Sequence, residues 1–228
     1  MSIYARLRAA RGHAGWWPGD TPFEVCVGAI LTQNTSWSNV DKALRVLRKK
    51  GRLSYEALRG CGPARIAPMI RSSGCYNVKA RRVAAFLAFL GREYGGRAQA
   101  MAAEDPEALR RQLLSVNGIG RETADSIALY AAGLPLFVVD AYTRRIFTRL
   151  GILTGDEDYD AVQRLFMDRL PRDPALYNDY HAQIVLHGKD VCRTVPRCGA
   201  CVLRDVCARR GVAARATFGQ RRSLARAQ

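Results

Sequence analysis

The feature that most limits how this chain can fold is a glycine hairpin between two helical segments, in LRRQLLSVNGIGRETADSIALYAAG. Gly118 and Gly120 stand two residues apart, and we expect both to allow positive φ and a close approach by another backbone. A helix beginning near Arg121 would present its N–H groups and positive dipole end beside them. The pattern predicts a helix–hairpin–helix that holds one phosphate of a nucleic-acid backbone. The alternative is an ordinary glycine turn between packed helices.

Most of the remaining chain also has the pattern of helices. They are expected in PFEVCVGAILTQ, in SNVDKALRVLRKKG and in NVKARRVAAFLAFLGREYGG, where Val83, Leu87 and Leu90 share a face. Asp105 is the expected N-cap of the next helix. Further helices are predicted at about 121–132, 141–150, 159–170 and 174–188. The single convincing extended run is LPLFVVD, so the fold class is predicted to be all-α.

The charge balance indicates a polyanionic partner. The 228 residues hold 36 Lys and Arg against 20 Asp and Glu, for a formal net charge of +16. Such an excess favours nucleic acid over a membrane surface or general basicity. We find no signal-peptide pattern and no apolar run of membrane-spanning length, and expect a cytoplasmic, nucleoid-associated bacterial protein. The arginine-rich tail after Cys207 is either a solvated terminus or an arm that contacts DNA.

Four of the seven cysteines fall within one C-terminal segment, CRTVPRCGACVLRDVC. They are Cys192, Cys198, Cys201 and Cys207. Thiolates at this spacing can wrap a tetrahedral metal or a [4Fe–4S] cluster. Zinc ribbons carry two C-x2-C knuckles and this segment has one, which favours the iron–sulfur cluster. The remaining cysteines are predicted to be core thiols: Cys26, Cys61 and Cys75.

An aspartate follows the extended run, in LPLFVVDAYTRRIFTRLG. Its apolar residues deliver Asp140 to the start of an arginine-rich helix. One interpretation is a simple N-cap. The other is a carboxylate in a dry, positive setting, which can activate a water or stabilise the oxocarbenium-like state of glycosidic cleavage.

Together these features resemble the endonuclease III superfamily of DNA glycosylases. The resemblance extends from about Pro22 to Cys207 and includes ILTQNTSW, SGCYNVKARR and HAQIVLHGKDVC. It implies two helical lobes. One is a six-helix barrel at 22–134 with the helix–hairpin–helix, and the other joins 1–21 to 135–228 and carries the iron–sulfur cluster loop.

The resemblance also implies a mode of binding to double-stranded DNA that contains a damaged base. Asp140 would act on the flipped nucleotide, Gln33 would enter the duplex, and the hairpin would hold a backbone phosphate. The expected DNA-binding residues are Gln33, Gly118, Ile119, Gly120, Arg121 and Arg144. We expect a monomer.

One position departs from the family pattern. Bifunctional members carry a lysine in the helix after the hairpin, and its amine forms a Schiff base with the sugar. That position is Glu122 here, and neither Arg121 nor Thr123 can substitute. AP lyase activity is therefore expected to be weak or absent. Glu122 is our second candidate catalytic residue beside Asp140. It either interacts favourably with the helix N-terminus or contacts the flipped base or a water.

The segment WWPGDTPFE resembles the 3-methyladenine glycosylase branch of the superfamily, in which Trp-Trp-Pro helps to line the base pocket. The candidate pocket residues are Trp16, Trp17, Tyr142 and Lys189. Aromatic faces bind a cationic alkylated purine by stacking and cation–π attraction. The alternative is that both tryptophans are core or interface aromatics. That branch often lacks the cysteine loop, which this chain has.

The sequence thus predicts a monofunctional DNA glycosylase of base excision repair that removes an alkylated purine. One alternative is an endonuclease III-type enzyme for oxidised or mismatched pyrimidines with weak AP lyase activity. Others are a non-catalytic damage-binding protein and a small iron–sulfur redox protein. Asp140 argues against a pure binder, because a buried carboxylate beside DNA phosphates disfavours binding. The hairpin and the positive charge argue against electron transfer as the main activity.

Overall fold

The computed structural model describes residues 2–15 and 19–213, which form helices joined by turns, with no strand in these two ranges. The predicted all-α class is confirmed. Residues 134–140, the expected extended run, link two helices without pairing to another segment as a strand. Of the helices described, none combines the length and the apolar character needed to cross a membrane.

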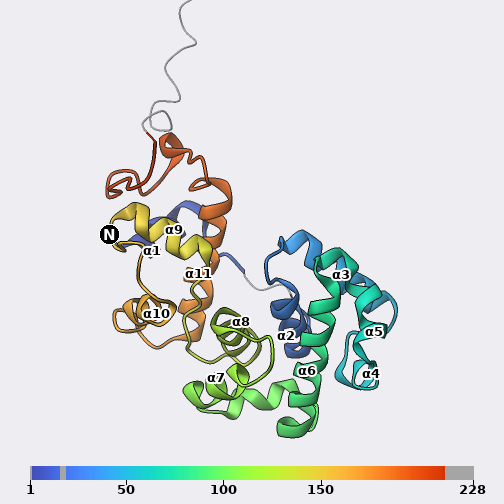
Figure 1. The fold of residues 1–228 in the computed structure, drawn as a ribbon. Helices are drawn as coiled ribbons and strands as arrows, with labels where there is room; N and C mark the ends of the chain where they lie inside the picture. Colours follow the sequence, from blue (N-terminus) through green and yellow to red (C-terminus); the bar gives the residue numbers. More distant parts are fainter. Residues whose placement is uncertain (1, 16–18, 214–228) are drawn as a thin grey trace, which may run out of the picture. The chain divides into compact units, whose positions relative to one another are not determined.

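Contacts divide the chain into two compact units (Figure 1). The hairpin unit comprises Trp17–Val138 and Arg172–Ala175. The cysteine unit comprises Met1–Trp16, Val139–Pro171 and Leu176–Gln228. The two functional lobes expected from the sequence, one at 22–134 and one joining 1–21 to 135–228, stay a prediction.

Helix α2 (Pro22–Leu31) forms the centre of the hairpin unit. Thr21 caps it by accepting a hydrogen bond from Glu24 N, and Pro22 occupies its first turn. Every residue after Pro22 is buried, as the nearly continuous apolar sequence requires. Helices α3 (Trp37–Lys49) and α6 (Tyr76–Tyr94) contact it, and α6 buries its predicted apolar face. The other elements are α4 (Tyr55–Leu58), α5 (Pro63–Ile66), η1 (Ala67–Ser73), η2 (Ala98–Ala103), α7 (Pro106–Leu114), α8 (Arg121–Ser126) and η3 (Ile127–Ala131).

The cysteine unit packs around aromatic side chains. Phe147 and Phe166 meet edge to face with ring centroids 4.7 Å apart, and Tyr180 lies 5.8 Å from Phe166. Tyr180 also contacts Tyr4 at 5.0 Å, which joins the N-terminal helix to this core. The elements are α1 (Ile3–Arg11), α9 (Ala141–Leu150), α10 (Tyr159–Met167), α11 (Pro174–Asp190) and η4 (Cys198–Ala200), with the first residues of α11 grouped in the hairpin unit.

The helix after the hairpin differs from the prediction. A single helix was expected over about 121–132, but the α-helix ends at Ser126 and continues as the π-helical turn η3. The backbone N–H of Ala132 donates to Ile127 O at 3.1 Å, the i to i−5 bond of such a turn. Helix α10 likewise ends at Met167, before the predicted residue 170, and α1 had not been predicted at all.

One cysteine prediction was wrong. Cys26 is fully buried and Cys61 is half-buried, but Cys75 is exposed. Cys75 adopts a left-handed conformation with φ 43° directly before α6, outside the helix whose apolar face enters the core. The apolar residues around it therefore did not predict its burial.

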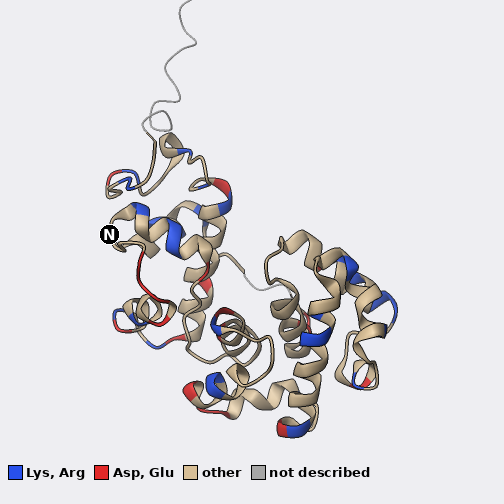
Figure 2. Cartoon of the chain, viewed as in Figure 1, with Lys and Arg blue, Asp and Glu red and all other residues tan. Residues whose placement is uncertain are grey.

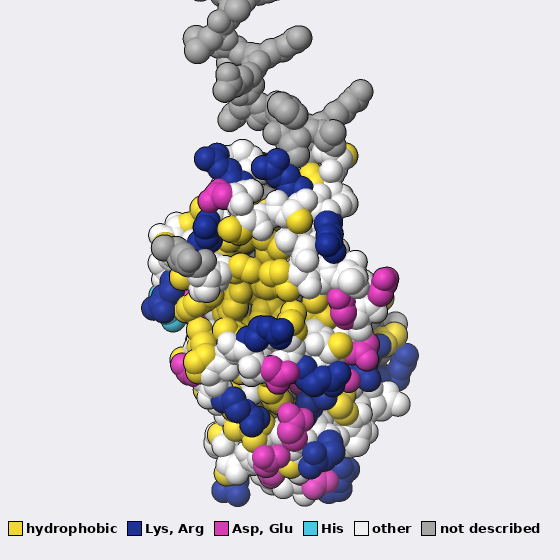
Figure 3. Space-filling view, turned by 90° about the vertical axis from the view of Figure 1, so that its left-hand side faces the viewer, with side chains coloured by type: hydrophobic (Ala, Val, Ile, Leu, Met, Phe, Trp, Pro, Cys, Tyr) yellow, Lys and Arg dark blue, Asp and Glu magenta, His cyan; other side chains and the backbone are white. Residues whose placement is uncertain are grey.

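The positively charged residues do not cover the surface evenly. Lys and Arg lie along helices of both units with Asp and Glu among them (Figure 2). On the face drawn in Figure 3, hydrophobic side chains and charged side chains of both signs are exposed. Helices α1 and α9 are exceptions, because each carries three arginines and no acid.

Candidate catalytic and nucleic-acid site

The two hairpin glycines have different roles. Gly118 has φ 86°, and a Cβ added there would collide with the side chain of Arg82. Gly118 therefore meets the expectation of positive φ and close approach. Gly120 has φ −92° and would admit a Cβ with nothing within 4 Å. The expectation of positive φ at Gly120 is wrong, because this residue is the extended N-cap of α8.

A glutamine joins the two sides of the hairpin. Gln33 Nε2 donates to Gly118 O at 3.0 Å and to Thr123 Oγ1 at 2.9 Å. Arg82 Nη1 donates to Gln33 Oε1. The side-chain amide thus ties the loop after α2 to both the turn and α8. Entry of Gln33 into a duplex stays a prediction, and it would require these hydrogen bonds to be exchanged.

A buried ion pair holds the two helices of the hairpin together. Arg110 Nε on α7 lies 2.8 Å from Asp125 Oδ1 on α8. The Asp125 side chain is 0% exposed and that of Arg110 is 14% exposed. A carboxylate this deep needs such a partner, so the pair determines how α7 and α8 can pack.

The start of α8 has no side-chain cap. Its N-cap is Gly120, which carries no side-chain acceptor for the first-turn N–H groups. Arg121 and Glu122 are both exposed in this first turn. An acid here interacts favourably with the positive end of the helix dipole, which is the simpler of the two roles expected for Glu122.

We expect Gly118→Ala to destabilise the hairpin unit by about 1–3 kcal/mol, because alanine would be strained at this φ and would displace Arg82 from Gln33. Gly120→Ser is the matched control, since serine fits both the extended N-cap conformation and the open space. Chemical denaturation of both variants checks the prediction. Equal stability of Gly118→Ala and wild type would contradict it.

Asp140 lies at the N-cap of α9, as one of the two interpretations predicted. Its Oδ1 accepts from Thr143 N at 2.7 Å and from Thr143 Oγ1 at 2.9 Å. Its Oδ2 lies 3.6 Å from Nε2 of His181 on α11. Burial raises the pKa of Asp140, but His181 and the hydrogen bonds from Thr143 outweigh burial and hold that pKa below its usual range. The carboxylate is therefore anionic at neutral pH, although its side chain is only 12% exposed.

The structure describes two of the four candidate pocket residues, Tyr142 and Lys189. The Tyr142 ring packs directly on Gly188, where a Cβ would collide with it, and the Arg145 guanidinium lies 5.0 Å from the ring centroid. Lys189 is exposed and directly follows Gly188. The structure therefore brings Tyr142 next to the peptide that joins Gly188 to Lys189. Arg144 Nη1 donates to Glu157 O at 2.7 Å. Trp16 and Trp17 lie outside the described residues.

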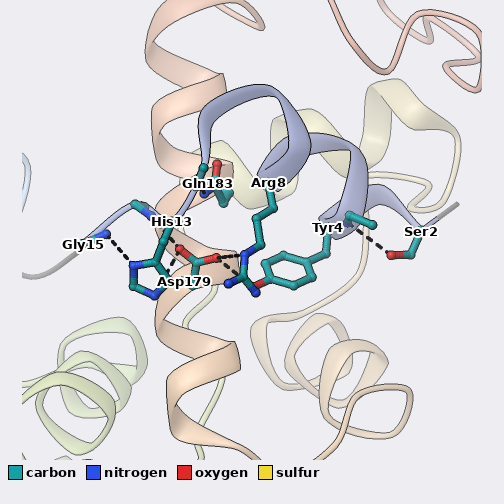
Figure 4. Close-up of polar contacts among 10 residues, drawn as sticks. Ser2, Tyr4, Arg8, His13, Gly15, Asp179 and Gln183 are labelled. Carbon is teal, nitrogen blue, oxygen red and sulfur yellow. Dashed lines mark hydrogen bonds and ion pairs between the residues drawn. The ribbon is translucent and has the colours of Figure 1, made fainter.

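The segment that leads to these tryptophans is fastened to α11 (Figure 4). Asp179, 2% exposed, accepts hydrogen bonds from Tyr4 OH at 2.7 Å and Ala14 N at 2.8 Å. One turn further along, Gln183 Nε2 donates to Gly12 O at 2.7 Å. These partly buried hydrogen bonds anchor the chain just before residue 16.

The cysteine loop is held by α9 and α11. Arg149 donates to Arg193 O at 2.6 Å and to Thr194 O at 2.9 Å. Arg145 Nε donates to Cys192 O at 3.0 Å, and Cys201 Sγ lies 3.5 Å from His187 Nε2.

The four thiols influence one another without forming a ligand set. Burial raises the pKa of Cys201, and charge on the other three thiols, Cys192, Cys198 and Cys207, raises it further. Within the part of the chain that the structure describes, no three Cys, His, Asp or Glu side chains converge as a metal site requires. The donor chemistry of the four thiols fits a thiolate-bound cluster.

Sequence reasoning missed His181, His187 and Arg149. Each acts on a residue far away in the sequence: His181 on Asp140, His187 on Cys201, and Arg149 on the loop after Cys192. No local pattern pairs them, because both histidines are separated from their partners by whole elements or a loop. The stretch HAQIVLHGK contributed to the family resemblance and supplied Lys189 as a candidate, but it gave neither histidine a partner.

The chain matches known proteins over most of its length. The family model described as HhH-GPD superfamily base excision DNA repair protein matches residues 27–172. A Methanocaldococcus jannaschii protein named as a DNA repair glycosylase is 43% identical over 90% of this chain and 94% of its own length. Endonuclease III of Thermotoga maritima is 32% identical over 82% of each chain.

Solved structures share the fold. An H. pylori 3-methyladenine DNA glycosylase bound to 1,N6-ethenoadenine has a TM-score of 0.70 at 28% identity, over 82% of this chain and 95% of that one. A trapped endonuclease III–DNA covalent intermediate has a TM-score of 0.77 at 24% identity, over 90% of this chain and 92% of that one. The chain belongs to the HhH-GPD superfamily of base excision DNA repair proteins, a family of DNA glycosylases.

Proposed function

We propose that this chain is a monofunctional DNA glycosylase that hydrolyses the N-glycosidic bond of a damaged base, with an alkylated purine as the favoured substrate. The observation that carries the proposal is the nearly buried carboxylate of Asp140, which accepts two hydrogen bonds from Thr143 and lies beside His181. Membership of the superfamily supports the reaction class.

The carboxylate suits the charge that develops during base release. Departure of the base leaves positive charge on the sugar, and an anionic carboxylate stabilises it. Oδ1 of Asp140 already accepts two hydrogen bonds from Thr143, so Oδ2 is the oxygen that would face the sugar or take a proton from the attacking water. An alkylated purine is cationic and leaves readily, so little further acid catalysis is needed.

Glu122 supports the monofunctional part of the proposal. Strand cleavage by a Schiff base needs an amine, and a carboxylate cannot supply it. Glu122 would instead contact the flipped base or a water, or act only on the helix N-terminus.

Double-stranded DNA containing a damaged base is the proposed partner, bound by a monomer. Gly118, Ile119, Gly120 and Arg121 would hold a backbone phosphate, aided by the absence of a side-chain cap at Gly120. Gln33 and Arg144 would add further contacts. Gly120→Ser would place a hydroxyl where the phosphate binds, so it is expected to weaken DNA binding without loss of stability.

The likeness to the H. pylori enzyme solved with 1,N6-ethenoadenine supports an alkylated purine. Tyr142, Lys189, Trp16 and Trp17 are the proposed pocket residues. A second candidate is an oxidised or mismatched pyrimidine, favoured by the 32% identity to an endonuclease III.

We also propose that the cysteine loop holds a [4Fe–4S] cluster through Cys192, Cys198, Cys201 and Cys207. The group would act as a structural clamp on the loop, whose backbone Arg145 and Arg149 already hold. Cys198→Ser is expected to remove most of the bound iron, about four atoms per chain, together with the visible absorbance of the cluster. Cys75→Ser, at an exposed cysteine outside the loop, is the control and should keep both. Iron determination and absorbance spectra measure the result, and equal iron in the two variants would contradict the assignment.

The function is tested with two duplex sets, one carrying methylated purines and one carrying thymine glycol or a mismatched pyrimidine. Each is incubated with the protein, with and without alkali and with borohydride. Release of alkylpurine, with strand breaks after alkali only and no borohydride-trapped adduct, is the expected result. Direct cleavage at oxidised pyrimidine with a trapped adduct would overturn the proposal. Tight binding with no release from either set would indicate a damage-binding protein.

Glu122→Lys offers a gain-of-function check on the same position. A lysine at this exposed site would restore the amine of bifunctional members, so we expect a borohydride-trapped adduct that wild type does not form. Arg121→Lys is the matched control, one residue away in the same helix turn. An adduct in both variants would show that the amine's position is not decisive.

A further inference from the structure

The two oxygens of the Asp140 carboxyl group are held by different parts of the fold. Oδ1 accepts two hydrogen bonds from Thr143, which is the ordinary arrangement of an N-cap. Oδ2 faces Nε2 of His181, 3.6 Å away on α11. Helix capping explains the first contact and not the second.

We propose that His181 is a positioning residue for Asp140, holding the Oδ2 side of the carboxylate while Thr143 holds the Oδ1 side. The inference rests on the proposed function, in which Oδ2 is the oxygen that meets the sugar or the water. It adds a residue, from a helix remote in sequence, that determines where that oxygen lies.

The two side chains of this contact are shielded from water. The side chain of His181 is 7% exposed and that of Asp140 is 12% exposed, so little water separates or screens them. At 3.6 Å the pair is longer than an ordinary hydrogen bond. His181 is also a principal reason that the pKa of Asp140 stays low despite burial.

The position of His181 on α11 supports a role in orientation. Residues 179–185 of α11 are all buried, so the ring projects from a backbone that is packed on all sides. The neighbouring polar residues Asp179 and Gln183 form hydrogen bonds with the N-terminal segment instead (Figure 4). A buried polar ring disfavours folding unless it has a polar neighbour, and Asp140 is such a neighbour of His181.

Two substitutions at residue 181 separate positioning from packing. His181→Leu removes the ring nitrogens and keeps an apolar side chain of moderate size, whereas His181→Gln keeps a donor near the place of Nε2. Single-turnover rates on the methylated-purine duplex, DNA affinity and thermal stability are measured for both. We expect His181→Leu to lower the rate about 10- to 100-fold with DNA affinity nearly unchanged, and His181→Gln to recover most of the rate. Equal rates in the two variants, or a wild-type rate in His181→Leu, would overturn the inference.

A second readout does not depend on base release. The chain has three histidines, so their ring-nitrogen NMR signals can be assigned with single substitutions. We expect the His181 signals to shift in Asp140→Asn, while those of His13, whose acidic neighbour is Asp179, stay in place. A shift in a chain that releases no base upholds the contact and overturns the proposed function. Unchanged His181 signals in a chain that does release base overturn the inference alone.

Discussion

Asp140→Asn is expected to lower the rate of base release by about 10²- to 10⁴-fold while the protein stays folded. Asparagine is as good an N-cap as aspartate, so the hydrogen bond from Thr143 N to the side chain can persist. The substitution removes the negative charge beside the sugar and the basic oxygen that would take a proton from the water. Single-turnover assays on the methylated-purine duplex, with circular dichroism to monitor the helices, measure both parts of the prediction.

The chain offers a matched control for this substitution. Asp158 caps α10 in the same manner, accepting from Ala161 N at 2.7 Å, but it is exposed. Asp158→Asn removes the same charge from the same kind of position, and its rate should match wild type. If Asp140→Asn released base as fast as Asp158→Asn, the carboxylate would be a helix cap only.

Arg110→Ala is expected to have the largest effect on stability, a loss of about 3–5 kcal/mol. The substitution removes the guanidinium 2.8 Å from a fully buried carboxylate, that of Asp125. Because this pair joins α7 to α8, the hairpin unit should unfold at lower denaturant concentration and bind DNA more weakly. The midpoint of chemical denaturation and the DNA affinity measure these two consequences.

Arg111→Ala is the control for Arg110→Ala, since Arg111 is an exposed arginine on the same helix. It loses the same charge without uncovering a buried acid, and its stability should lie within about 0.5 kcal/mol of wild type. The double variant Arg110→Met with Asp125→Leu should recover part of the loss, because an apolar pair avoids burying an unpaired charge. Similar midpoints for Arg110→Ala and Arg111→Ala would contradict the role of the ion pair.

Local patterns were sufficient for most of the helices and for the family. Asp105 and Asp140 occupy the N-cap positions of their helices, as the sequence had suggested, since capping depends on a few adjacent residues. The apolar stripe of α6 is buried because a period of 3.6 residues places Val83, Leu87 and Leu90 on one face. The match of residues 27–172 to the family model confirms the family to which the hairpin and the aspartate pointed, and the cysteine loop lies outside the matched range.

Contacts between remote segments account for what local patterns could not predict. Gly118 requires glycine and Gly120 does not, because Arg82 packs on one and nothing on the other. Cys75 is exposed because the chain reverses into a left-handed conformation before α6. The pairing of Asp140 with His181 depends on how α9 and α11 pack, and such packing is a property of the whole core. The residues of this chain alone thus determine most of its helices, its class and its candidate chemistry. The tertiary structure decides which of those groups meet, because burial and proximity are set by segments far apart in the sequence.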